Sequence, residues 1–167
     1  MDAEKVSIRI SWTPFDPEAE AAHFRRRCAR AGAIATFLGQ VRGENGAVAS
    51  LALEHYPGLT EAEIGRIAEQ ACARWPLEAV AIAHRVGVMA PGEPIVFVAA
   101  AAAHRRPAFE AVDFLMDYLK SEAPFWKKET GADGSARWIE PRAEDSRDKA
   151  RWAPDASSQG AQRAWRK

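Results

Sequence analysis

The apolar run at residues 95–103 is the feature that most restricts how this chain can fold. It contains no polar side chain, so a strand built from it should be covered on both faces and lie centrally in a sheet. The run is far too short to cross a lipid bilayer. We therefore expect a sheet in which residues 94–103 form a central strand.

Further strands are predicted from alternating or continuous apolar patterns. They cover residues 6–12, 33–41, 48–56 and 77–89, and a short pair follows at 125–130 and 137–140. The turn-rich residues 43–46 predict that 33–41 and 48–56 form a hairpin, and residues 90–93 predict a turn before the central strand. Residues 131–134 would connect the short pair.

Three helices are predicted from hydrophobic residues at helical spacing and from their end signals. Asp16 and Pro17 open the first helix, which stops at Gly32. Thr60 and Glu63 form a capping box for the second, which Pro76 ends. The third covers residues 107–121. Helices that alternate with hairpins predict an α+β fold with a mostly antiparallel sheet.

The last residues differ in character from the rest of the chain. We expect residues 1–143 to form one folded domain and residues 144–167 to be a charged tail. Trp152 and Trp165 are the only large apolar groups in this tail. It is therefore predicted to be mobile or docked on a partner rather than part of the core.

Charge and cysteine content exclude several classes of function. The formal net charge is zero, so the whole protein has no long-range attraction to nucleic acid or to an anionic membrane. The acidic N-terminus is not followed by an apolar signal segment, which predicts a cytoplasmic protein. Cys28 and Cys72 are predicted to be core residues in a reducing compartment. No metal-binding or nucleotide-binding spacing occurs, so neither a metal nor a cofactor is expected.

Two segments concentrate positive charge at the ends of predicted elements. His104 and Arg105 lie between the central strand and a helix whose first turn is marked by Pro107. Free backbone N–H groups and the helix dipole favour an anion there, and a solvated basic junction is the alternative. Arg42 follows another strand and could form a bidentate contact with phosphate.

Lys120 and Lys127 flank a short turn that contains Pro124, so their amines could converge. Neighbouring cations and partial desolvation would make one of them a usable base or nucleophile. Strand geometry places Phe125, Lys127 and Glu129 on one face and Lys128 on the other. The alternatives are an exposed Asp117–Lys120 pair and a solvated pair of lysines that protects a sheet edge. His55 is interpreted as structural.

Six segments, in this order, resemble the large, catalytic subunit of molybdopterin synthase over roughly residues 5–143. They are Phe37-Leu38-Gly39-Gln40-Val41-Arg42, Leu53-Glu54-His55-Tyr56-Pro57-Gly58, Ala103-His104-Arg105, Met116-Asp117-Tyr118-Leu119-Lys120, residues 124–129, and Arg137-Trp138. The resemblance implies an α/β-hammerhead type of fold with a small added β subdomain.

The same resemblance implies a sulfurtransferase of molybdenum cofactor biosynthesis. Such a subunit moves sulfur from the C-terminal Gly-Gly thiocarboxylate of a small ubiquitin-like subunit to cyclic pyranopterin monophosphate (precursor Z), which becomes molybdopterin. Two large subunits would dimerise and bind two small ones, giving a heterotetramer. Two sets of residues are implied: the catalytic Lys120 and Lys127, and the substrate-binding Gln40, Val41, Arg42, His104, Arg105, Lys128 and Glu129.

One departure from the family and two alternatives accompany this interpretation. Many relatives carry lysine where this chain has Gln40, which removes a charge and puts a direct substrate role of this position in doubt. A non-catalytic module could use the same cations to bind an anionic ligand or a protein tail. Nucleic-acid binding by the tail is disfavoured by its acidic residues, among them Glu144 and Asp148.

Overall fold

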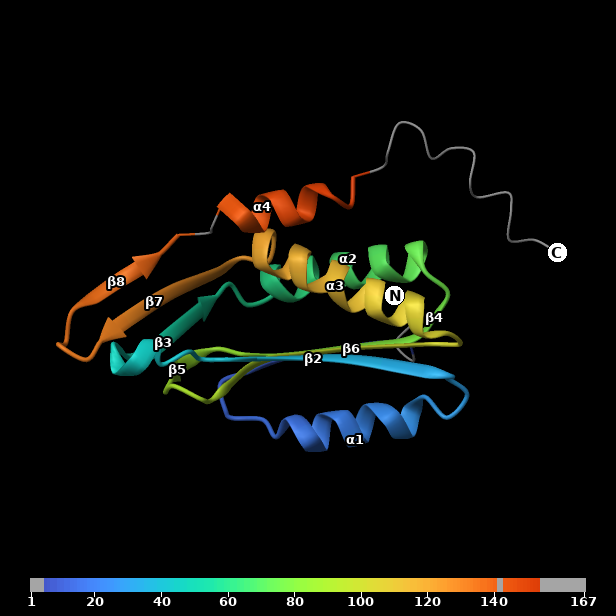
Figure 1. Ribbon diagram of the computed structural model, residues 1–167, viewed down its shortest axis with the longest axis horizontal. Coiled ribbons are helices and arrows are strands. Elements are labelled where there is room, and N and C mark those ends of the chain that lie inside the picture. The colour runs from blue at the N-terminus through green and yellow to red at the C-terminus, as the bar shows by residue number, and fades with distance from the viewer. Residues whose placement is uncertain (1–4, 141–142, 154–167) are drawn as a thin grey trace.

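The computed structural model describes residues 5–140 and 143–153 (Figure 1). The elements follow one another as β1 (Val6–Ser11), α1 (Pro17–Arg27), β2 (Ala33–Gln40), the 3-10 turn η1 (Glu44–Gly46), β3 (Val48–His55), α2 (Leu59–Arg74), β4 (Leu77–Arg85), β5 (Gly87–Met89), β6 (Pro94–Ala102), α3 (Arg105–Ser121), β7 (Phe125–Gly131), β8 (Ala136–Ile139) and α4 (Ala143–Ala150).

The strands form two sheets, and the helices cover the first of them on both faces. The first sheet has the order β1-β4-β6-β2 and the second β5-β3-β7-β8. Only the β1–β4 pair is parallel among the described strands. Figure 1 shows α1 on one face of the first sheet, α2 and α3 on the other, and α4 outside α3. The predicted α+β architecture with mostly antiparallel strands is confirmed.

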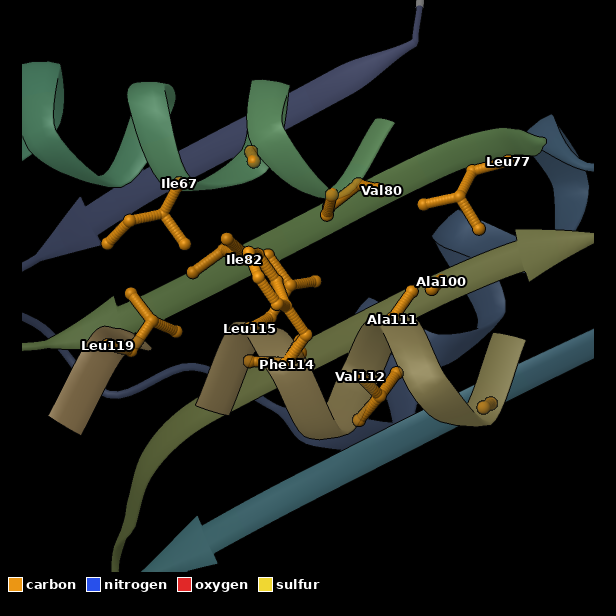
Figure 2. Close-up of a cluster of buried hydrophobic side chains, with 14 of the residues drawn as sticks. Ile67, Leu77, Val80, Ile82, Ala100, Ala111, Val112, Phe114, Leu115 and Leu119 are labelled. Carbon is orange, nitrogen blue, oxygen red and sulfur yellow. The ribbon is translucent and has the colours of Figure 1, made fainter. Parts of the chain in front are cut away.

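β6 is central and buried on both faces, as its apolar sequence predicts. Val98 and Ala100 contribute to the core beneath α2 and α3, whereas Phe97 and Ala99 contribute to the core beneath α1. This alternation follows from the two-residue period of a strand. The larger core, drawn in Figure 2, is filled by side chains of α2, β4 and α3, including Ile67, Val80, Ile82, Phe114 and Leu115.

The predicted hairpin of residues 33–41 and 48–56 is wrong. β2 pairs with β6 in the first sheet, whereas β3 pairs with β5 and β7 in the second. The chain leaves β2 at Val41, whose N–H donates to the Glu93 carbonyl and whose carbonyl accepts from Gly92. The apolar β6 needs a neighbour on each side, and β2 supplies one of them.

The predicted strand of residues 77–89 is divided between the two sheets. β4 ends at Arg85, the Val86 N–H donates to the Ser11 carbonyl, and β5 begins at Gly87. Gly87 has φ +88°, and a Cβ there would lie 3.2 Å from the ring of Trp12. A glycine at this position therefore allows the chain to turn from one sheet into the other.

The helix starts differ in part from those predicted. Asp16 caps α1 through a bond from the Glu18 N–H, as expected, but α1 ends at Arg27. α2 begins at Leu59, and its first turn is closed by the Gly58 N–H donating to Glu61 at 2.6 Å. The Thr60–Glu63 box is wrong, because the Thr60 hydroxyl accepts from Tyr56 and donates to the Pro124 carbonyl instead. α3 begins at Arg105, before Pro107.

Trp152 departs from the expectation that no part of the tail contributes to the core. Its ring packs against Trp75 and Phe114, with ring centroids 5.7 and 5.6 Å apart. Its Nε1 donates to the Asp117 carboxylate at 2.6 Å, and Arg151 donates to the same oxygen at 2.7 Å. Two donors thus satisfy the buried Asp117 and fix the end of α4 on α3. Trp165 lies outside the described residues.

Candidate active site at the junction of the two sheets

Lys127 lies on the covered face of β7. It pairs in register with Leu53 of β3 and with Ile139 of β8. Leu53 is fully buried, and residues that face each other across strands project to the same side of a sheet. The lysine stem therefore packs against apolar groups, which fixes the direction of its amine.

Lys128 projects to the opposite face of the second sheet. It is exposed, and its Nζ lies 5.7 Å from the centre of the Trp138 ring. The alternation predicted for β7 is therefore found, and the two lysines do not share a face. Glu129 returns to the face of Lys127, where its carboxylate accepts a bond from Arg137 at 2.8 Å.

Two histidines stand next to Lys127, and neither was predicted to take part in the site. His84 is buried near the end of β4, and its ring stacks on Phe125 with centroids 4.0 Å apart and planes 16° from parallel. Burial, together with smaller electrostatic effects of Lys127 and His55, lowers the pKa of His84 to about 4. His55 lies opposite Phe125 in the register, and its Nε2 is 3.6 Å from Glu61.

The sequence carried one sign of this cluster. His84 and Arg85 are a polar pair at the end of β4, a strand that is otherwise mostly apolar and buried. Buried polar residues at the end of a strand are unusual and often belong to a site. The partners of His84 come from distant segments, so the pair alone did not identify them.

Lys120 occupies the last turn of α3, at a pocket of about 290 Å³ between α3 and β2. Phe37 and Phe109 supply apolar walls, and Asp113 and Asp148 supply carboxylates. The alternative Asp117–Lys120 pair is not formed, because Asp117 binds Arg151 and Trp152. Lys120 and Lys127 thus lie on consecutive elements but in different surroundings.

The segment Gln40–Arg42 is held by the turn at residues 90–93. Gln40 donates to the Gly92 carbonyl at 3.3 Å, and Val41 is buried between its two backbone bonds to this turn. The turn is fixed in its own right, because Arg85 donates to Glu93 at 2.6 Å. This ion pair lowers the pKa of Glu93. Arg42 projects outward, 3.5 Å from Glu44.

His104 and Arg105 form the exposed N-terminal end of α3, with His104 as the N-cap residue. Lys120 lies at the other end of the same helix. At 1.5 Å per residue, Arg105 and Lys120 are about 22 Å apart along the axis. A single chain therefore does not bring His104 and Arg105 together with Lys120.

Two wider features of the described residues bear on the site. No group of three His, Cys, Asp or Glu side chains is arranged there to hold a metal ion. Among the same residues, no helix is long and apolar enough to span a membrane.

The chain is similar to known proteins of one family. The sequence pattern of the family described as MoaE protein matches residues 10–122. The molybdopterin synthase catalytic subunit of Caulobacter vibrioides is 57% identical over 149 residues, which cover 89% of this chain and 99% of that protein. The subunit of the same name from Pseudomonas aeruginosa is 48% identical, over 88% of this chain and 99% of that protein.

Solved structures support the same assignment. The molybdopterin biosynthesis MoaE protein from Burkholderia ambifaria has a TM-score of 0.76 and 49% identity, over 90% of this chain and 99% of that chain. The molybdopterin synthase structure from Staphylococcus aureus has a TM-score of 0.68 and 26% identity, over 84% of this chain and 98% of that chain. On sequence and fold alike, the chain belongs to the MoaE protein family.

Proposed function

We propose that this chain is the catalytic subunit of a molybdopterin synthase. It transfers sulfur from the C-terminal thiocarboxylate of a small ubiquitin-like carrier to cyclic pyranopterin monophosphate, forming the dithiolene of molybdopterin. The observation that carries the proposal is Lys127, a titratable amine held on the covered face of β7 in a chain 57% identical to a named catalytic subunit. A partly desolvated amine is suited to act as base or nucleophile.

The cations divide into two tasks. Lys120 and Lys127 serve the chemical step, because an amine exchanges protons and a guanidinium group does not. Arg42, His104 and Arg105 hold the phosphate and the pterin of the substrate. Three residues line the site: Gln40, Val41 and Glu129. Lys128 lies on the other face of β7 and contributes positive charge at the rim of the site.

Two copies of the chain complete one site in this proposal. The length of α3 separates Arg105 from Lys120 in one copy, so His104 and Arg105 come from a second copy. β2 is an edge strand of the first sheet, and Ile34, Phe37 and Leu38 on it are more than one-third exposed. An exposed apolar edge strand is a suitable surface for a symmetric dimer.

The carrier binds through its C-terminal tail. A carboxylate or thiocarboxylate tail needs a cationic site, and the lysines beside the second sheet provide one. With one carrier on each catalytic subunit, the assembly is a heterotetramer that works in the cytoplasm. Calorimetry with the intact carrier, and with a carrier that lacks its last two residues, tests tail insertion. Equal affinities for the two would contradict it.

Molybdopterin formation tests the function directly. The purified chain is mixed with cyclic pyranopterin monophosphate and thiocarboxylated carrier, and molybdopterin is measured in a single turnover. Product should appear only with all three components. Folded protein that binds the carrier but yields no product would instead favour a non-catalytic module that binds anionic ligands or protein tails.

A further inference from the structure

His84 lies where it can act on Lys127 without touching the substrate. Its ring stacks on Phe125, which lies two residues before Lys127 on the same face of β7. Lys127 therefore projects to the side of β7 that His84 covers, and its positive charge is one of the causes that lower the pKa of His84. Because β4 belongs to the first sheet and β7 to the second, His84 connects the two at the candidate active site.

The hydrogen bonding of His84 fixes its tautomer. Nδ1 lies 2.9 Å from the Arg85 carbonyl oxygen, which can only accept, so Nδ1 carries the proton and donates. The pKa of about 4 keeps the ring neutral at physiological pH. Nε2 is then left with a lone pair, which makes it a hydrogen-bond acceptor.

The charged and titratable groups around His84 agree with a neutral ring. Lys127 approaches from β7 and His55 from β3, and each disfavours a positive charge on His84. The guanidinium of the next residue, Arg85, is directed away to Glu93. Within residues 5–140 and 143–153, no carboxylate that would favour protonation acts on His84.

We propose that His84 is a positioning residue for Lys127, whose amine donates a hydrogen bond to the Nε2 lone pair of the neutral imidazole. This inference rests on the proposed function, in which Lys127 serves the chemical step. The imidazole holds the amine in one orientation and does not compete for its proton. An acceptor fixed by stacking on Phe125 restricts a side chain that otherwise has four rotatable bonds.

Nitrogen NMR tests the contact without an activity assay. Full-length protein with ¹⁵N-labelled histidine should show the Nδ1–H tautomer of His84 from pH 8 to pH 5. Lys127→Met should shift the Nε2 resonance of His84, and Lys128→Met, on the opposite face of the same strand, should leave it unchanged. Equal shifts in the two variants, or none in either, would overturn the proposal.

Two substitutions of His84 test its effect on the reaction. His84→Phe keeps a ring that can stack on Phe125 but removes the acceptor, and the single-turnover rate should fall roughly tenfold or more with carrier affinity unchanged. His84→Gln places an amide oxygen near the position of Nε2 and should recover most of the rate. Equal rates in the two variants would show that the acceptor is irrelevant.

The two kinds of failure are distinguishable. If wild-type protein forms no molybdopterin, the proposed function fails, and the NMR comparison still decides whether Lys127 contacts His84. If wild-type protein is active and His84→Phe has the same rate, only the role of His84 fails. Should His84→Phe not fold, the Lys127→Met and Lys128→Met spectra alone decide.

Discussion

The two sheets of this protein differ in how they are covered. In the first sheet, β6 is buried on both faces between α1 and the pair α2 and α3. In the second sheet, β7 alternates between a covered face with Lys127 and an exposed face with Trp126 and Lys128. We infer that the first sheet supplies most of the stability. The second sheet, which is covered on one face only, carries the reacting amine on that covered face.

The burial of each sheet explains why the reacting amine lies in the second sheet rather than in the first. A lysine on β6 would be enclosed on both faces of the first sheet, at a large desolvation cost. On β7 the apolar stem of Lys127 contacts buried groups while its strand remains near solvent. His84 of the first sheet stacks on Phe125, two residues before Lys127.

Phe114→Ala should be the most destabilising of these changes. Phe114 is fully buried on α3 and contacts Trp75, Tyr118 and Trp152. Loss of its ring should lower the free energy of unfolding by about 3–5 kcal/mol. Trp126→Ala, in the second sheet, removes a partly exposed ring and should cost about 1 kcal/mol. Urea unfolding of both variants measures the difference, and similar losses would contradict the division.

The pH dependence of stability should report His84. Its pKa is about 4 in the folded protein and about 6.5 when unfolded, so the unfolded chain binds more protons between these values. Stability should therefore fall as the pH falls from about 6.5 to 4, by up to roughly 3 kcal/mol at 1.36 kcal/mol per unit. His84→Gln should lack this component. Urea unfolding of both proteins across this range gives the two slopes, and identical slopes would exclude a buried neutral His84.

Lys127→Arg should reduce activity with little effect on stability. Arginine keeps the charge but stays protonated, so single-turnover molybdopterin formation should slow roughly a hundredfold or more. Lys120→Arg should be less harmful, because Lys120 is exposed at the end of α3. Lys149→Arg on α4 keeps an ion pair with Glu122 and is a matched control. Near-normal rates in Lys127→Arg and Lys120→Arg would favour plain anion binding.

Local patterns in the sequence were sufficient to predict most helices and strands and to predict which side chains of one strand share a face. The apolar composition of β6 predicted its central place, and the alternation along β7 separated Lys127 from Lys128. Asp16 predicted the start of α1. These features depend on neighbours within a few residues, which is why one sequence reveals them.

Pairing between distant segments could not be predicted in the same way. The predicted hairpin of residues 33–41 and 48–56 was wrong because the two strands pair with distant partners. β2 pairs with β6, whereas β3 pairs with β5 and β7. The stacking of His84 on Phe125 depends on the same tertiary pairing. The residues of the candidate site were identified from resemblance and charge. Only the fold shows that His104 and Arg105 lie at one end of α3 and Lys120 at the other.

Arg42→Ala and Arg105→Ala should have the smallest effects, on substrate binding rather than on the chemical step. Each removes one exposed guanidinium group, so affinity for cyclic pyranopterin monophosphate should fall about tenfold, with stability and carrier binding retained. Equilibrium binding of the substrate measures this loss. Unchanged affinity in both variants would remove them from the phosphate site.

A mixture of variants sharpens the comparison further, because Arg105 and Lys127 should meet only across two copies. Arg105→Ala and Lys127→Ala proteins are each impaired alone, but a dimer of one with the other retains one complete site. Unfolding and refolding the two together should therefore restore part of the single-turnover activity, measured at a substrate concentration too low to saturate Arg105→Ala. Refolding each variant alone is the control. If the mixture gains nothing although mixed dimers form, the phosphate-binding cations belong to the same copy as the amine, and the about 22 Å length of α3 must be bridged in another way.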